Sequence, residues 1–452
     1  MNELEVDVAV LGGGPAGIAA ALGAARMGAS TLLIERYGFL GGMSTISLVY
    51  PWQTFHTMAG KQVIRGVAQD IVDELVRRNA SPGHLRDTIG FVHTLTPFDP
   101  DMFKLVAAEM LLDSGCRLML HTYVAEAEAK DGHIASVKVV NKSGMQTVKS
   151  KIFIDTTGDA DVAYWAGTEV LKGRESDHKT QPMTMKFRMN HVNIDAIRDY
   201  MKQHPDEFYK KSLIADLDRI PLTGVQGFYK HWKEADLPIL RDQVLFFIGP
   251  REDEVLINQS RVSGYDGTQV EDLTKAEVEG RRQVVMIAEF LNRQIPGFEN
   301  ARITQVGTQI GVRETRRAVG LYQLNRDDVI QGRKFEDVIA RSGYPIDIHD
   351  PSGKGVDSAW IGDDGAYDIP YRCLLPKEVD NLLMAGRCMS TTHDAHSTTW
   401  LTPSCMATGQ AAGTAAAMAA LKGVSPHDLQ VGELQRNLLT NRADLGFSLV
   451  DL

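Results

Sequence analysis

The sequence predicts an α/β fold, because apolar segments of strand length alternate with segments of helical composition along much of the chain. Residues 5–11 are a largely apolar run of the size of a buried parallel strand. An alanine-rich segment follows, with Pro15 near its start, where proline favours the first turn of a helix. A chain of 452 residues is too long for one simple core, so two packed domains are expected.

The same alternation continues along the chain. Residues 31–35 predict a second strand, 62–79 a helix with a 3.6-residue apolar period, and 101–114 another helix. Three strand-like pieces within 117–156, separated by turn signals, predict a β-meander. A long helix is expected near 275–293, with Thr274 and Glu277 at capping-box spacing at its start. Residues 381–387 predict a last central strand, and a helix of small residues follows.

Charge and composition exclude several classes of protein. The net charge of −10 and the lack of long basic runs argue against a nucleic-acid partner. No stretch reaches the roughly 18 apolar residues of a membrane span, and acidic residues stand where a basic leader would begin. The cysteines, which form no CxxC pair, are Cys116, Cys373, Cys388 and Cys405. We therefore expect no metal site, no membrane and a cytoplasmic location.

A glycine motif directly after the first strand predicts a Rossmann-like dinucleotide site. Gly12 allows a tight turn, Gly14 allows the backbone to approach a pyrophosphate, and Gly17 allows close packing of helix on strand. The helix N-terminus offers free N–H groups to the phosphates. Glu35, at the end of the second strand, can accept hydrogen bonds from ribose hydroxyls and would repel the 2′-phosphate of NADP.

Four further blocks bear a family resemblance. They are residues 35–44 (ERYGFLGGMS), 154–161 (IDTTGDAD), 311–317 (GVRETRR), and 381–387 (NLLMAGR) with its downstream segment 403–413 (PSCMATGQAAG). The chain resembles FAD-dependent oxidoreductases of the fumarate-reductase and glucose-inhibited-division types. The resemblance implies a glutathione-reductase-type FAD-binding domain built from discontinuous segments, a second mixed α+β domain, and FAD bound non-covalently.

The resemblance also implies which residues contact FAD. The expected residues are Gly12, Gly14, Pro15, Ala16, Gly17, Glu35, Arg36, Gly41, Gly42, Met43, Ser44, Val124, Thr157, Gly158, Asp159, Gly386, Arg387, Asp394, Met406, Ala407, Thr408 and Gly409. Met406 to Gly409 would open the last helix and direct its dipole at the flavin, which is anionic when reduced. Relatives often carry arginine where Trp400 stands, so a catalytic role of that arginine does not transfer.

The candidate catalytic residues are His396, His393, His349 and Arg313. A histidine beside the flavin can accept a proton near neutral pH, and His396 is preferred over His393. The alternatives are ordinary hydrogen bonding for the histidines and an ion-paired structural role for Arg313, Arg316 and Arg317. Cys405 at the head of the closing helix is a weaker candidate, as are Trp52 and His56 on the substrate side.

These observations predict an FAD-dependent oxidoreductase. Hydride would pass between flavin N5 and a small polar organic substrate, with oxidation of CH–OH or CH–NH favoured and an unidentified electron acceptor or donor. The alternatives are a reductase of an activated C=C bond, an RNA-modifying flavoprotein and a non-catalytic nucleotide-binding protein. The expected domains are 1–175 for FAD (with a helical insert at 45–100 and a meander at 117–156), 176–335 for substrate, and 336–452 returning to FAD. A homo-oligomer is compatible with the sequence.

Overall fold

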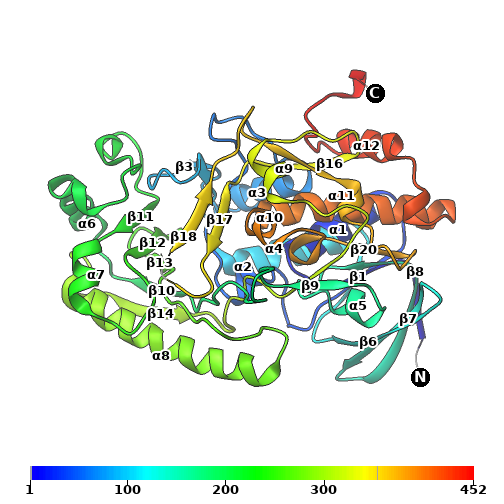
Figure 1. The fold of residues 1–452 in the computed structure, drawn as a ribbon, viewed down its shortest axis with the longest axis horizontal. Coiled ribbons are helices and arrows are strands. Elements are labelled where there is room, and N and C mark those ends of the chain that lie inside the picture. The colour runs from blue at the N-terminus through cyan, green and yellow to red at the C-terminus, as the bar shows by residue number, and fades with distance from the viewer. Residues whose placement is uncertain (1–2, 354, 452) are drawn as a thin grey trace.

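The computed structural model describes residues 3–353 and 355–451. It is a mixed α/β structure in which a parallel, Rossmann-like sheet and an antiparallel sheet lie at opposite ends of an elongated molecule (Figure 1). The strands β17 (Ile346–His349) and β18 (Val356–Ala359) form a hairpin between the two ends (Figure 1). Among the described residues, no helix is long and apolar enough to cross a membrane.

The parallel sheet has the order β5-β2-β1-β8, and β20 pairs with the far half of β8. These strands are β1 (Glu3–Leu11), β2 (Thr31–Ile34), β5 (Arg117–Met119), β8 (Gly144–Asp155) and β20 (Leu382–Met384). Both faces of β1 are buried, because Val8 and Val10 pack toward the helices while Ala9 and Leu11 pack on the opposite side. The strands predicted at 5–11, at 31–35 and within 381–387 are confirmed as β1, β2 and β20.

A β-meander covers the second face of this sheet. It consists of β6 (Tyr123–Lys130), β7 (His133–Asn141) and the first half of β8, all antiparallel. Ile134 and Val137 of β7 join the same core as Ala9 and Leu11 of β1. The segment expected as its first strand is split, because residues 117–119 pair in parallel with β2 and only 123–130 enter the meander.

The helices on the other face include α1 (Pro15–Arg26), α3 (Val67–Arg77), α4 (Pro100–Asp113) and α11 (Thr402–Lys422). Figure 1 shows α1 and α11 side by side. They approach closely because a Cβ on Gly409 or Gly413 would lie 2.1 Å from the Ala16 oxygen or 1.9 Å from the Ala20 oxygen. The helix expected at 62–79 is shorter, because Gln62 forms an isolated β-bridge with His56, residues 63–65 are irregular, and α3 begins only after Gly66, whose φ is 60°.

The antiparallel sheet has the order β11-β12-β13-β10-β14. Its strands are β10 (Phe187–Asn190), β11 (Gly224–Gly227), β12 (Val244–Ile248), β13 (Val255–Ile257) and β14 (Arg302–Val306). Helix α8 (Val270–Gln294) packs Ile287 and Leu291 into the same core as Phe187 and Phe246. Helices α6 (Ile194–Gln203) and α7 (Tyr229–Ala235) also lie at this end (Figure 1).

The predicted capping box on the long helix is wrong. Helix α8 begins at Val270, four residues before Thr274, so Thr274 lies inside it. The Thr274 hydroxyl instead donates to the Val270 oxygen at 2.8 Å, and the Glu277 carboxylate accepts from the Ile310 N–H at 2.7 Å. The Thr274 hydroxyl thus bonds within its own helix, and Glu277 makes a tertiary contact, so neither side chain forms a cap.

Shorter elements connect these two parts. The remaining helices are α2 (Met43–Ile46), α5 (Asp161–Trp165), α9 (Arg326–Ile330), α10 (His393–Thr399) and α12 (Val431–Thr440). The remaining strands are β3 (Leu85–Arg86), β4 (Thr94–Leu95), β9 (Val170–Lys172), β15 (Arg316–Ala318), β16 (Val338–Ser342) and β19 (Tyr367–Pro370). The pairing of β15 with β9 returns the chain to the parallel-sheet end.

Candidate functional site

The glycine turn between β1 and α1 has little space for side chains. Gly12 has a φ of +114°, and a Cβ there would lie 2.5 Å from the Thr156 oxygen. A Cβ on Gly17 would lie 1.8 Å from the Gly12 oxygen, so α1 can rest on the strand only with glycine at that position. Gly14 differs, because the nearest protein atom to a Cβ there is the Gly42 Cα at 3.8 Å. The open side of the turn is therefore at Gly14.

Glu35 supports the turn from the end of β2. Its Oε2 accepts a hydrogen bond from the Gly13 N–H at 2.6 Å, and its Oε1 accepts one from the Tyr37 N–H at 2.9 Å. Burial raises the pKa of Glu35, although the backbone donors counteract that effect. The carboxylate also lines a cavity in front of the turn.

This first cavity encloses about 1050 Å³ of empty space, part of it open to solvent. The residues expected at FAD that line it are Gly12, Gly14, Pro15, Ala16, Glu35, Arg36, Gly42, Met43, Val124, Thr157, Gly158 and Arg387. A dinucleotide fits these residues, because Gly14 leaves the cavity open and Arg387 Nη1 is a buried donor without a hydrogen-bond partner in the described structure. We call this space the dinucleotide cavity.

The other residues expected at FAD do not line the dinucleotide cavity. Gly17, Gly41, Ser44, Asp159, Gly386, Asp394 and Met406 to Gly409 are not among its lining residues. Asp159 accepts a hydrogen bond from Arg387 at 2.9 Å, and Ser44 accepts one from the Trp52 indole at 3.1 Å. Asp394 lies further away and pairs with Arg326 at 3.1 Å.

The closing helix α11 begins at Thr402, so Met406 to Gly409, which were expected to open it, lie after its first turn. Its first turn therefore presents Thr402 and Cys405 to the dinucleotide cavity. Burial raises the pKa of Cys405 to about 12, so it is a thiol at neutral pH and not an acidified nucleophile. Gly409 instead provides the close contact with α1 at Ala16.

A second cavity adjoins the first and shares Met43, Val49 and Trp400 with it. It encloses about 1570 Å³ of empty space, again partly open to solvent, and Arg313 and His349 line it. We call it the substrate-side cavity. Trp52 and His56 line neither cavity, since Trp52 stacks on Phe98 and His56 Nδ1 lies 2.9 Å from the Thr94 hydroxyl.

His349 reaches the substrate-side cavity because of strand alternation. Ile346 and Ile348 of β17 are buried in the core, so Asp347 and His349 lie on the opposite face. Their cross-strand partners on β18, Ser358 and Val356, line the same cavity. Burial and the charges of Arg313 and Arg241 hold the pKa of His349 well below its ordinary value, so its imidazole is neutral at pH 7.

His393 and His396 do not line either cavity. His393 Nδ1 lies 2.9 Å from Oε1 of Glu314, a buried carboxylate that also accepts from the Gln181 N–H at 3.0 Å and from Arg317. Burial works to raise the pKa of Glu314, but the His393 hydrogen bond and nearby cations outweigh it and lower that pKa. Burial lowers the pKa of His396 to about 3, and both of its ring nitrogens lack a hydrogen-bond partner in the described structure.

Four charged or polar residues that line the substrate-side cavity were not among the candidates from the sequence: Lys186, Arg241, Tyr344 and Asp347. Asp347 Oδ2 accepts a hydrogen bond from the Tyr344 hydroxyl at 2.9 Å and lies 3.9 Å from His349 Nε2. Asp347 could have been found from the sequence, because it lies two residues before His349 and alternate residues of a strand share one face. Within residues 3–353 and 355–451, no group of three or more His, Cys, Asp or Glu side chains is arranged to hold a metal ion.

Comparison with known families now decides the assignment. Residues 7–438 match the family described as FAD dependent oxidoreductase. The chain belongs to this family. Its family membership makes this chain a flavoprotein of the FAD-dependent oxidoreductase type.

Individual relatives match only part of the chain, at 26% to 28% identity. Thiamine thiazole synthase of Methanococcus vannielii is 26% identical over 178 residues, which cover 36% of this chain and 60% of that protein. Digeranylgeranylglycerophospholipid reductase of Picrophilus torridus is 28% identical over 212 residues, which cover 44% and 49%. The flavoprotein thus spans less than two thirds of either relative.

A solved structure shares the fold. The p-nitrophenol 4-monooxygenase of Pseudomonas putida DLL-E4 superimposes with a TM-score of 0.51 at 11% identity, covering 100% of this chain and 92% of that chain. At this identity, the likeness shows the fold of the flavoprotein alone.

Proposed function

We propose that the flavoprotein oxidises a CH–OH or CH–NH group of a small polar organic substrate. The observation that carries this proposal is that the dinucleotide cavity and the substrate-side cavity share Met43, Val49 and Trp400. A cofactor in one space and a substrate in the other would then meet at a common wall. Bound FAD supplies hydride acceptance at its flavin ring.

In this proposal FAD is held non-covalently by residues of the dinucleotide cavity. Gly12, Gly14 and the N-terminus of α1 receive the pyrophosphate, and Glu35 receives a ribose. Arg387, with an unpaired buried nitrogen, donates to the cofactor. Residues 1–175 and 336–452 form the FAD-binding domain, and 176–335 form the cap that supplies substrate contacts. The antiparallel sheet has its own core, formed by residues between Met183 and Val312, which supports a separate cap. Ala318, Leu324 and Val329 pack instead in the cores of the parallel-sheet end.

His349 is the candidate proton acceptor. It lines the substrate-side cavity and is neutral at pH 7, so a ring nitrogen is available for the O–H or N–H proton of the substrate. Asp347 lies 3.9 Å away, beyond hydrogen-bond distance, and its charge would favour the protonated imidazole that forms, while Arg313 orients the substrate. His393, which does not line the cavity, bonds the buried Glu314 carboxylate. His396, whose ring nitrogens have no hydrogen-bond partner in the described structure, has no role in this proposal.

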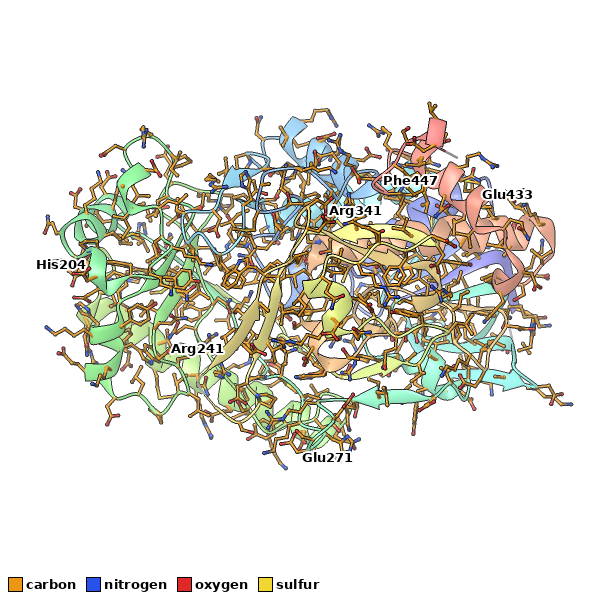
Figure 2. All side chains as sticks on the ribbon, turned by 45° about the horizontal axis from the view of Figure 1, so that its top comes forward. His204, Arg241, Glu271, Arg341, Glu433 and Phe447 are labelled. Atoms are coloured by element: carbon orange, nitrogen blue, oxygen red, sulfur yellow. The ribbon has the colours of Figure 1, made fainter. Side chains whose placement is uncertain are left out.

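The experiment uses purified protein loaded with FAD and mixed anaerobically with a panel of alcohols and amines. Loss of the visible flavin band reports reduction. Once a substrate is found, we expect His349→Gln to keep its FAD and to reduce the flavin about 10²-fold more slowly. The control is His204→Gln, an exposed residue after the end of α6, labelled at the left edge of Figure 2 and absent from the lining of both cavities. This variant should reduce the flavin at the normal rate.

A normal rate in His349→Gln would exclude this residue as the base. If no alcohol or amine reduces the flavin, while an activated alkene reoxidises chemically reduced protein, the reductase alternative replaces the proposed direction. An RNA-modifying role remains disfavoured by the net charge of −10.

A further inference from the structure

Three cations line the substrate-side cavity without acidic partners. Lys186, Arg241 and Arg313 are 8%, 4% and 6% exposed. In the described part of the chain, no ion pair with an N···O distance up to 4.0 Å joins any of them to an acid. Arg241 donates only to the backbone oxygens of Asn258 and Gln259, and the Arg313 Nε has no hydrogen-bond partner among the described residues.

Other buried arginines of this protein do have acidic partners. Arg188 pairs with Glu254 at 2.6 Å, and Arg317 pairs with Glu314. Arg341, which is 2% exposed, pairs with Asp364 at 2.7 Å and Asp368 at 3.1 Å. Figure 2 labels Arg341 near the middle of the molecule and Arg241 toward the antiparallel-sheet end. Arg261, which is 3% exposed and lines neither cavity, also lacks an acidic partner among the described residues. The substrate-side cavity is where three such cations line one space.

Leaving these charges unpaired is costly to the folded state. Burial, followed by the repulsion of Arg313 and Arg241, lowers the pKa of Lys186 to about 7. Burial and neighbouring arginines lower the pKa of Arg241 to about 9 and that of Arg313 to about 10. Two acids, Asp242 and Asp347, also line the cavity, so three cations leave an excess of positive charge. Perturbed groups of this kind in a cavity mark a ligand site.

We infer that the substrate-side cavity binds an organic acid, whose carboxylate lies among Lys186, Arg241 and Arg313 and whose body is apolar. The apolar part of the wall includes Ile89, Phe91, Leu245 and Phe247. A bound carboxylate would supply the missing counter-charge, and it would raise the pKa of His349 toward neutrality by offsetting the same cations. This inference rests on the proposed function, which assigns the cavity to the substrate.

The test measures equilibrium binding to the FAD-loaded protein by calorimetry at fixed ionic strength. The probes are phenylacetate, cinnamate and hexanoate, each compared with its neutral amide, and phenyl phosphate. We expect at least one acid to bind saturably and at least tenfold more tightly than its amide. Equal binding of acids and amides, or binding of none of the acids, would overturn the inference. Tenfold tighter binding of phenyl phosphate than of every acid would overturn the carboxylate assignment.

Two variants test the cations separately. Arg241→Met and Lys186→Met should each weaken acid binding at least tenfold and reduce the preference for acid over amide. Their thermal midpoints without ligand should stay the same or rise, because an unpaired buried charge has been removed. The control Lys202→Met, on the exposed side of α6, should change neither property. An unchanged acid preference in both cavity variants contradicts the inference, even if one of them folds poorly.

The result is separable from the test of catalysis. Acid binding without flavin reduction by any alcohol or amine would leave the organic-acid site standing and remove the proposed reaction. Flavin reduction by neutral alcohols or amines, with no binding of acids, would support the proposed reaction and remove the organic-acid site.

Discussion

In the turn after β1, Gly14 is needed for cofactor binding and not for folding. At Gly14 the backbone has a φ of −72° and a ψ of −178°, which alanine also adopts, and the nearest atom to an added Cβ is 3.8 Å away. At Gly17 an added Cβ would lie 1.8 Å from the Gly12 oxygen. The two positions of one motif therefore have different physical roles.

We expect Gly14→Ala to lose FAD without losing stability. The methyl group would occupy cavity space, so FAD affinity should fall at least tenfold. In FAD-free protein the thermal midpoint should be unchanged or higher, because alanine at a compatible backbone geometry stabilises by about 0.4–1 kcal/mol. Gly17→Ala should instead lower the midpoint of the FAD-free protein. Full FAD content in purified Gly14→Ala would contradict this assignment of the turn.

Lys186 gives the flavoprotein a testable pH dependence. Its pKa falls from 10.5 to about 7 on folding, so between these values the unfolded chain binds a proton that the folded chain does not. The free energy of unfolding should therefore rise as pH increases from about 7 toward 10.5, by up to about 1.4 kcal/mol per pH unit. The other titratable groups that line this cavity are Tyr50, Tyr209, Tyr229, Arg241, Asp242, Arg313, Tyr344, Asp347 and His349.

Comparison with Lys186→Met separates this effect from the other groups. Urea unfolding at pH 7 and pH 9 should show wild-type stability rising relative to the variant. Parallel changes in the two proteins would mean that Lys186 keeps an ordinary pKa in the fold.

At the scale of elements, the contact of α1 with α11 sets the geometry of the dinucleotide cavity. We expect Gly413→Ala to destabilise the protein by about 1–3 kcal/mol, because its Cβ would lie 1.9 Å from the Ala20 oxygen and the helices must separate. The matched control is Gly432→Ala in α12, where an added Cβ meets nothing within 4 Å. Thermal unfolding of FAD-free protein measures both, and equal midpoints would contradict the close-packing account.

Elements with strong local patterns could be predicted from sequence, and those that depend on tertiary partners could not. The strand over residues 5–11, the glycine turn and the closing helix follow from apolar runs and glycine spacing. Thr274 and Glu277 have the spacing of a cap, but the helix continues through them to Val270. His393 and His396 seemed to face the flavin because their segment follows β20, yet α10 directs His393 toward Glu314.

At the scale of the whole molecule, the site combines segments that are far apart in sequence. The dinucleotide cavity could largely be predicted, since its glycines and Glu35 lie in local motifs. The cations of the substrate-side cavity could not be predicted, because Lys186, Arg241 and Arg313 come from three separate segments. No local pattern indicates that these side chains share a space. His349 was among the candidates, but its neighbour Asp347 required the strand alternation of β17.

The central claim is that the cavity before the glycine turn holds FAD. The most direct measurement is the visible spectrum of the purified protein, followed by acid precipitation and quantification of the released cofactor. The account predicts a yellow protein that releases about one FAD per chain, with the flavin absent from the precipitate. A colourless protein that also fails to bind added FAD would contradict the claim, and flavin retained by the denatured chain would contradict non-covalent binding.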